Sequence, residues 1–264
     1  MTSEDRDHTS VAEPGEAGSR SSRSHSHARK NKKKHLPVWQ ETLLLLGIAL
    51  VLAIVIKALF VQAFYIPSES MEPGLVKNDR ILVQKVSYWF GGSPKRGDVV
   101  VFKDPGDWLG PEESAGPQSG LTSLMAKIGL YPSGGHLVKR VIGVAGDTIK
   151  CCDKQGRISV NGKPLNEKSY VKQDGTQCNG PMIGCNWTAG PVPKGHIFVM
   201  GDNRGHSADS TVHMCTKDET DCVPGDEYVD TDLVVGKVFV LLWPSDRFSW
   251  LHRPDTFAGV PNAS

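Results

Sequence analysis

The stretch Leu43–Val61, LLLLGIALVLAIVIKALFV, holds nineteen residues with a single charge, Lys57. In a helix, about 20 residues at 1.5 Å each span roughly the 30 Å hydrocarbon core of a bilayer. A lysine near one end can extend its aliphatic stem and place its amine at the interface. We therefore predict a single transmembrane helix over residues 42–64. A buried core helix is less favoured because apolar residues cover every face.

The residues before this stretch are polar and basic. Ser19–His35 holds seven basic residues and no acid. Such a segment cannot bury enough apolar surface to offset its chain entropy, so we expect residues 1–41 to form a disordered tail. Because basic residues flank the cytoplasmic end of a span, we predict a single-pass protein of the cell membrane with a cytoplasmic N-terminus. Everything after about residue 64 would then lie outside.

A removable signal peptide is the alternative for the same stretch, because Val61-Gln62-Ala63 resembles a small-x-small cleavage site. Two features favour a retained anchor. About 40 residues precede the apolar stretch, and the stretch itself is longer than the apolar region of an ordinary signal peptide.

The charge of the whole chain is nearly balanced. Of 264 residues, 30 are Lys or Arg and 29 are Asp or Glu, and from Ile66 onward 21 basic residues face 23 acidic ones. A nucleic-acid-binding domain normally shows a basic excess. The pattern therefore indicates no nucleic-acid partner, and the basic tail points to membrane lipids instead.

The remainder of the chain favours a mainly β fold. Alternating or continuous apolar runs are separated by Gly, Pro, Asp and Asn, and none has convincing helical length. We expect one domain over residues 65–253, with a Pro/Gly/Ser-rich insertion at 104–136 that contains a short amphipathic segment, Leu121–Leu130, and a C-terminal tail over 254–264. The expected strands are Arg80–Val86, Asp98–Phe102, Leu137–Val144, Ile158–Val160, His196–Met200 and Leu233–Trp243.

All six cysteines follow the apolar stretch, on the side that we place in an oxidising compartment. Equal spacing favours two local disulfides, Cys178 with Cys185 and Cys215 with Cys222. The adjacent pair Cys151-Cys152 is not expected to bond to itself, because a disulfide requires a particular Cα separation and dihedral angle. A zinc site is the less favoured alternative; it would draw on Cys215, Cys222, His206 and His213.

Four polar segments are hard to explain by packing, and no G-x-S-x-G, H-E-x-x-H or P-loop motif is present. They are IPSESMEPGL (Ile66–Leu75), RGDVVVF (Arg96–Phe102), KRVIGVAGD (Lys139–Asp147) and GDNRGHSADS (Gly201–Ser210). In this order, behind an N-terminal anchor, they closely resemble the type I signal peptidases of bacteria, membrane serine proteases that remove signal peptides from exported proteins. The single span and basic tail are similar to the form of Gram-positive bacteria.

The resemblance implies a signal-peptidase-like catalytic domain with Ser70 as nucleophile and Lys139 as general base. A serine hydroxyl is a poor nucleophile until a base takes its proton. Period-2 alternation places Leu137, Lys139 and Val141 on one strand face that is apolar except for the lysine. Desolvation there would lower the pKa of Lys139 and favour the neutral amine.

Other residues acquire roles from the same resemblance. Ser68 and the backbone N–H of Ser70 would form the oxyanion hole. Ser207 would hold the amine of Lys139, and Asp202 would pair with Arg140. The walls of shallow pockets for small side chains of the substrate are expected from Phe64, Ile66, Pro67, Met71, Leu75, Leu137 and Val138.

The sequence departs from the family pattern after the last segment. Thr211 stands where many relatives have an arginine that pairs with the acid matching Asp209, which leaves the role of Asp209 open. Gly74 replaces a usual threonine, and a cysteine-bearing loop, Val212–Val223, follows. Neither change touches Ser70 or Lys139.

The favoured function is thus cleavage of preprotein signal peptides after small-x-small sites by a monomer near the export machinery, without metal or cofactor. One alternative is a self-cleaving Ser/Lys regulatory protease, which would carry a helix-turn-helix at its N-terminus. Another is a non-catalytic surface binding module on a membrane stalk. Phe64, Ile66, Trp89 and Phe90 are expected in a membrane-contacting patch, since aromatic rings favour the interface.

Overall fold

The computed structural model describes residues 37–106, 108–110, 119–122, 134–172, 175, 184–215 and 222–263. The chain divides into two units, residues 1–46 and 47–264, with the boundary inside helix α1 (Val38–Phe60). In the first unit, the described residues are Pro37 and the beginning of α1. The second unit contains the rest of the helix and all of the strands.

Helix α1 occupies an earlier stretch than the predicted 42–64. It begins after Pro37, whose carbonyl accepts hydrogen bonds from the N–H groups of Gln40 and Glu41. Within the described residues it is the one helix long and apolar enough to cross a membrane, with a mean hydropathy of 2.2 over Val38–Ile56. Residues 61–64 continue as strand because Val61–Tyr65 pairs with Gln84–Arg80 of the next strand.

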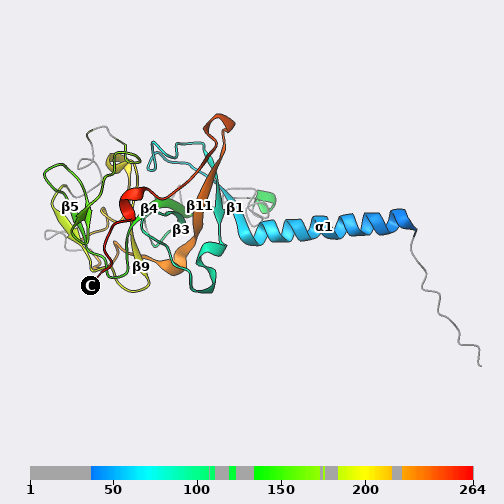
Figure 1. Cartoon of the computed structure of the whole chain (residues 1–264), viewed down its shortest axis with the longest axis horizontal. Helices are drawn as coiled ribbons and strands as arrows, with labels where there is room; N and C mark the ends of the chain where they lie inside the picture. The colour runs from blue at the N-terminus through cyan, green and yellow to red at the C-terminus, as the bar shows by residue number, and fades with distance from the viewer. Residues whose placement is uncertain are drawn as a thin grey trace, which may run out of the picture. The chain divides into compact units, whose positions relative to one another are not determined.

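The fold is mainly β, as the sequence predicted. An eight-stranded antiparallel sheet has the order β1-β2-β11-β3-β4-β9-β10, with β12 paired to β11, and a four-stranded sheet has the order β7-β6-β5-β8. Figure 1 shows β1, β11, β3, β4 and β9 side by side, with β5 of the smaller sheet beyond them. The strands are β1 (Val61–Tyr65), β2 (Arg80–Gln84), β3 (Val99–Lys103), β4 (His136–Val144), β5 (Ile149–Cys151), β6 (Ser159–Val160), β7 (Lys163–Pro164), β8 (Trp187–Ala189), β9 (His196–Met200), β10 (Val229–Asp230), β11 (Val234–Trp243) and β12 (Ser249–Trp250).

In the described part of the chain, four short 3₁₀ helices lie between strands, and a fifth follows the last strand. They are η1 (Val86–Gly91), η2 (Arg204–His206), η3 (Thr231–Leu233), η4 (Ser245–Arg247) and η5 (Asp255–Phe257). All of the long predicted strands are present, and β9 has the predicted bounds. The others shift by one or two residues at an end, where turn hydrogen bonds rather than hydrophobicity decide where pairing stops.

The C-terminal segment is part of the domain rather than the expected tail over 254–264. Phe257 and Val260 are buried against the smaller sheet. The carbonyl of Pro261 accepts a hydrogen bond from Asn161, and the Thr256 hydroxyl accepts one from the N–H of Asn166. Burial of two apolar side chains fixes a segment whose polar composition resembles a tail.

The cysteines follow the expectation in one case and contradict it in another. Cys215 and Cys222 form a disulfide with Cα atoms 5.4 Å apart, which uses the two thiols that the zinc alternative required. Cys151 and Cys152 are also bonded to each other. The expectation for this adjacent pair is wrong because the peptide bond between them is cis and brings their Cα atoms to 3.0 Å. Cys178, and with it the pairing predicted for Cys185, lies outside the described residues, as does most of Leu121–Leu130.

Candidate active site

Ser70 and Lys139 meet in the interior of the second unit. Ser70 lies in the turn that follows β1, and Lys139 is the fourth residue of β4. Their side chains are in hydrogen-bond contact, with the Nζ of Lys139 donating to the Oγ of Ser70 over 2.7 Å. Only 6% of Ser70 and 4% of Lys139 is exposed. A hydroxyl and an amine from segments 69 residues apart are thus brought together away from bulk water.

The pairing of β4 explains how a lysine comes to lie inside. Lys139 is directly opposite Val100 of β3, and Leu137 is opposite Phe102. Directly opposed residues share a face of the sheet. Val100, Leu137 and Val141 belong to one buried cluster, so Lys139 shares an apolar face with them, as the alternation predicted.

Ser68 lies next to the nucleophile. Its Oγ is 3.3 Å from the Oγ of Ser70. Ser68 is partly exposed, while Ser70 is buried. When a carbonyl carbon is bonded to the Ser70 Oγ, a hydroxyl at this position can approach the oxygen on that carbon. This is the place required of an oxyanion donor.

Asp209 organises the segment beside the nucleophile, and its role, left open by the sequence, is now visible. One carboxylate oxygen accepts from the Ser207 hydroxyl at 2.7 Å and from the Gly201 N–H at 2.9 Å. The other accepts from the backbone N–H and the hydroxyl of Thr211, at 3.0 and 2.7 Å. Thr211 therefore supplies two of the donors to this carboxylate. That Ser207 also holds the amine of Lys139 stays a prediction.

Arg140 and Asp202 form the predicted ion pair. The guanidinium donates twice to the carboxylate, at 2.8 and 2.6 Å, and once to the carbonyl of Gly97 at 2.9 Å. It also lies 4.5 Å from the ring centre of Tyr170. Burial is the largest single effect and acts to lower the pKa of Arg140, but the charge and hydrogen bonding of Asp202, together with Tyr170, raise this pKa overall. The pair connects β4 to the segment after β9 and fixes both beside Lys139.

Two residues near the nucleophile were missed by the sequence reasoning. Asn203 donates its backbone N–H to the carbonyl of Ser70 at 3.0 Å and its side-chain amide to the carbonyl of Glu69 at 3.1 Å. Gly201 lies so close that a Cβ added there would be 2.3 Å from the Ser207 Oγ and 2.4 Å from the Ser70 carbonyl oxygen. The roles of Asn203 and Gly201 arise where the segment after β9 approaches the turn that holds Ser70. In the sequence, only their position inside the Gly201–Ser210 block pointed to them.

The apolar residues predicted as substrate-binding fall into two groups. Phe64, Ile66, Met71 and Leu75 are buried in one cluster, with Val138 packed against it. Leu137 belongs to the other cluster, beside Val100, and Pro67 is exposed. Because Phe64 and Ile66 are only 6% and 2% exposed, the expectation that they form part of a membrane-contacting patch is wrong.

A buried serine hydroxyl in contact with a lysine amine, next to a second hydroxyl, is an arrangement suited to the acyl-transfer chemistry of serine hydrolases. Over residues 39–243 the chain matches the family described as signal peptidase, peptidase S26. The chain belongs to this family. The resemblance seen in the sequence, and with it the prediction of a signal peptidase hydrolase, is confirmed.

The chain is similar to individual signal peptidases. The probable signal peptidase I of Mycobacterium leprae (strain TN) is 36% identical over 233 residues, which cover 82% of this chain and 80% of that protein. Signal peptidase I of Mycobacterium tuberculosis (strain ATCC 25618 / H37Rv) is 38% identical over 225 residues, covering 79% and 74%. A solved structure of a signal peptidase I from Enterococcus faecalis V583 has a TM-score of 0.32 at 22% identity and covers 55% of this chain and 95% of that chain.

Proposed function

We propose that the protein is a membrane-anchored serine endopeptidase that removes signal peptides from exported preproteins after small-x-small sites. The observation that carries the chemistry is the 2.7 Å contact between the buried Nζ of Lys139 and the Oγ of Ser70. Burial disfavours a charged amine. Once Lys139 is neutral, the same contact lets the Ser70 hydroxyl donate its proton to the amine.

The steps follow from this geometry. The Ser70 oxygen attacks the carbonyl carbon before the cut while Lys139 takes the hydroxyl proton. The oxyanion of the tetrahedral intermediate accepts from the Ser70 N–H and from Ser68. Lys139 then gives its proton to the departing amine, and the acyl group stays on Ser70. Water hydrolyses this ester with Lys139 again acting as base.

Hydrogen bonds from neighbouring residues hold the proposed catalytic groups in position. Asn203 fixes the backbone of Glu69 and Ser70, and Asp209 fixes Ser207 and Gly201 beside it. The buried apolar residues Phe64, Ile66, Met71 and Leu75, with Val138, support the pockets for small side chains. Asp202 and Arg140 act structurally, and no metal or cofactor takes part in the proposed steps.

Helix α1 is the proposed anchor, and the strands that follow it, together with the C-terminal segment, form the proposed catalytic domain on the outer side. The positive charges before the helix support a cytoplasmic N-terminus. A removable signal peptide ending at Ala63 is less favoured, because the cut would take three residues from β1, which pair with β2. A monomer that contacts lipids near the export machinery completes the proposal.

The deciding experiment is incubation of the detergent-solubilised full chain with a preprotein bearing an A-x-A site, followed by mass determination of the product. We expect a single cut directly after that site, absent with Ser70→Ala. Cleavage elsewhere would contradict the assigned substrate, and self-cleavage without cleavage of the preprotein would support the regulatory protease instead. The binding-module alternative requires that no product form.

A further inference from the structure

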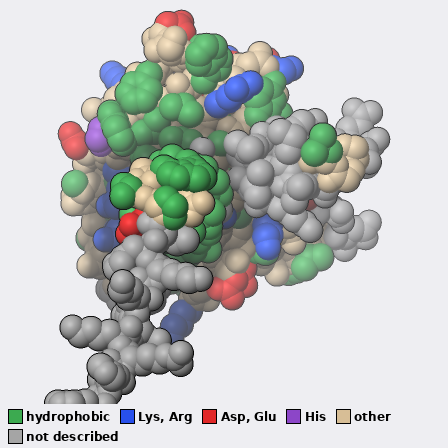
Figure 2. Space-filling view, turned by 90° about the vertical axis from the view of Figure 1, so that its right-hand side faces the viewer, with side chains coloured by type: hydrophobic (Ala, Val, Ile, Leu, Met, Phe, Trp, Pro, Cys, Tyr) green, Lys and Arg blue, Asp and Glu red, His purple; other side chains and the backbone are tan. Residues whose placement is uncertain are grey.

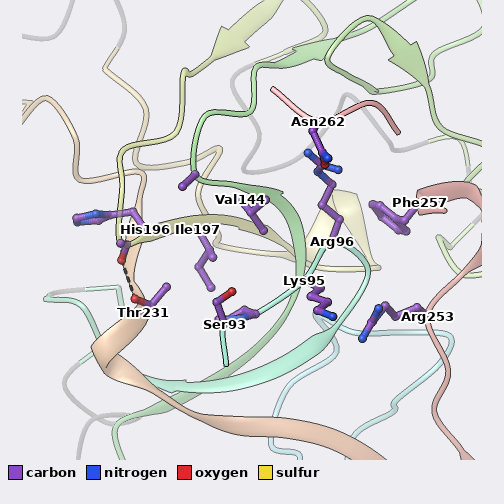
Figure 3. Close-up of a pocket in the computed structure, with 13 residues that line it drawn as sticks. Ser93, Lys95, Arg96, Val144, His196, Ile197, Thr231, Arg253, Phe257 and Asn262 are labelled. Atoms are coloured by element: carbon purple, nitrogen blue, oxygen red, sulfur yellow. Dashed lines mark hydrogen bonds between the residues drawn. The ribbon is translucent and has the colours of Figure 1, made fainter. Parts of the chain in front are cut away.

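A pocket of about 430 Å³ opens in the domain at a place where none of the proposed catalytic residues lies. Its walls come from five segments: the loop before β3, the end of β4, the start of β9 with the residue before it, the start of η3 and the C-terminal segment. Figure 3 shows these walls around one opening, with a hydrogen bond from Thr231 to the carbonyl of Gly195 closing one side. The volume is in the usual range for a small-molecule site, about 300–1,000 Å³.

The basic side chains at this pocket outnumber the carboxylates behind it. Asp98 is shared by Arg253, at 2.6 Å, and Lys237, at 2.8 Å. Asp147 accepts two hydrogen bonds from Arg96, at 2.6 and 2.5 Å. Lys95, which also lines the pocket and is exposed, has no ion-pair partner among the described residues. Three basic side chains that line the pocket, Lys95, Arg96 and Arg253, therefore lie beside two buried carboxylates, and one of these carboxylates is also paired with Lys237.

This excess lies at one side of the opening. Figure 3 shows the basic ends of Lys95 and Arg253 on the same side of the pocket. Arg253 is held in place by Asp98, and its side chain is still 42% exposed. An anion entering beside Lys95 would meet two like-charged donors whose mutual repulsion it relieves.

The remaining lining combines apolar contact with hydrogen-bonding groups. Val144, Ile197 and Phe257 provide apolar surface, and Phe257 is anchored in the core of the smaller sheet. Ser93 and Asn262 add polar side chains. A phosphate group fits the basic side because it accepts several charge-assisted hydrogen bonds at once, and the volume leaves room for a small organic group against the apolar wall.

We propose that this pocket binds a small phosphate ester, either a soluble one or the headgroup of an anionic phospholipid. The proposal gives a use to the Arg96-Gly97-Asp98 motif, which the catalytic mechanism leaves largely unused. Arg96 and Asp98 build the pocket, while the carbonyl of Gly97 accepts from Arg140 of the active site. It also gives a use to the C-terminal segment, which supplies Arg253.

The test is calorimetric titration of the full chain in neutral detergent with sn-glycerol 3-phosphate and with short-chain phosphatidylglycerol. Lys95→Glu reverses an exposed charge without disturbing the buried pairs, and we expect it to weaken binding about tenfold or more. Lys154→Glu is the matched control, since Lys154 is also exposed and lies in the β5–β6 turn; it should bind as the unaltered chain does. Ala145→Phe tests shape without changing charge, because Ala145 lines the opening, and it should weaken binding too.

The ligands separate the two sources. Saturable, Lys95-dependent binding of glycerol 3-phosphate supports a soluble ester, and such binding of phosphatidylglycerol alone supports a lipid headgroup. Glycerate, which has a carboxylate in place of the phosphate-bearing CH2 group, should bind at least about tenfold more weakly. Equal binding of glycerate, equal weakening by Lys95→Glu and Lys154→Glu, or no binding of either phosphate ligand would overturn the proposal. Because Ser70→Ala should leave all these titrations unchanged, the result does not depend on the proposed proteolysis.

Discussion

Thr211 donates both its backbone N–H and its hydroxyl to one oxygen of the buried Asp209 carboxylate, at 3.0 and 2.7 Å. The other oxygen binds Ser207 and Gly201. A buried carboxylate is stable only when its lone pairs are satisfied. Thr211 thus supplies both donors to one carboxylate oxygen from two residues away in the chain. The other oxygen accepts from Ser207 and Gly201 and so orients the segment beside Ser70.

Thr211→Val removes one donor to Asp209 while keeping the shape of the side chain. Loss of a hydrogen bond to a buried charge costs about 1.5–3 kcal/mol. We expect the free energy of unfolding to fall by about this amount, and kcat to fall about tenfold because Ser207 loses its fixed acceptor. Thr211→Ser retains the hydroxyl and should restore both. Preprotein turnover and thermal unfolding of the two variants check this; equal behaviour of valine and serine would contradict it.

Ser70 and Lys139 should act as a unit. Ser70→Ala and Lys139→Ala are each expected to abolish turnover to a similar extent, with the double variant little worse than either, because each residue is useless without the other. Ser68→Ala should retain weak activity, since loss of one oxyanion donor costs about 10²–10³ in rate. Single-turnover rates on one preprotein measure all four variants. Clearly additive losses for the pair would show that the two side chains work independently.

Gly201→Ala should inactivate the enzyme without touching a reacting atom. The new Cβ would meet the Ser207 Oγ and the Ser70 carbonyl oxygen at 2.3 and 2.4 Å, and overpacking typically costs about 1–3 kcal/mol. The nucleophile or Ser207 must move, so we expect at least about a hundredfold loss of kcat with a measurable fall in the unfolding temperature. Gly110→Ala is the control, because nothing lies within 4 Å of a Cβ there. Wild-type activity of Gly201→Ala would refute the close approach.

The stability of the domain should depend on pH through His213. Its ring stacks on Trp108 with centroids 4.3 Å apart, and its Nδ1 is 3.7 Å from the Asp226 carboxylate. Burial lowers the pKa of His213, although Asp226, Asp209 and Asp104 act to raise it. The folded state therefore disfavours the protonated ring, and stability present above the unfolded pKa of about 6.5 is lost as pH falls through the lower folded pKa.

His213→Phe keeps an aromatic ring on Trp108 and removes the titration. We expect the unfolding temperature of the unaltered chain to drop more between pH 7.5 and pH 5 than that of this variant. His206→Phe, at an exposed position, controls for loss of a histidine elsewhere. If the unfolding temperatures of the unaltered chain and of His213→Phe fall in parallel with pH, His213 is not the source of the pH dependence.

The sequence predicted those parts of the site that depend on local pattern. Alternation predicted Lys139 on an apolar strand face, and the lysine is buried opposite Val100 of β3. The roles of Gly201 and Asn203 were not predicted, because they exist only where two segments distant in the sequence are in contact. The packing of the C-terminal segment was not predicted, because its two apolar residues, Phe257 and Val260, are too few to indicate burial.

The exposed aromatic residues near the end of the chain suggest where the domain meets a membrane. Trp243, Phe248 and Trp250 are 54%, 51% and 59% exposed, and Trp89 is 40% exposed. Figure 2 shows hydrophobic side chains, with basic ones scattered among them, on the face turned to the viewer. Aromatic rings favour the membrane interface, and the revised patch replaces the buried Phe64 and Ile66 by these residues.

A fragment of residues 61–264, which keeps β1 whole, should fold, cleave short peptides and bind liposomes, while requiring lipid or detergent to cleave full preproteins well. Replacing Phe248 and Trp250 by serine should weaken liposome binding by roughly tenfold or more, since each ring loses its favourable transfer to the interface. Val223→Ser is the control, because Val223 is 67% exposed and apolar. Co-sedimentation with liposomes measures all three proteins. If the fragment ignores liposomes, or if the control loses as much binding as the double variant, the patch is wrong and helix α1 is a simple tether that raises the local concentration of enzyme at the membrane.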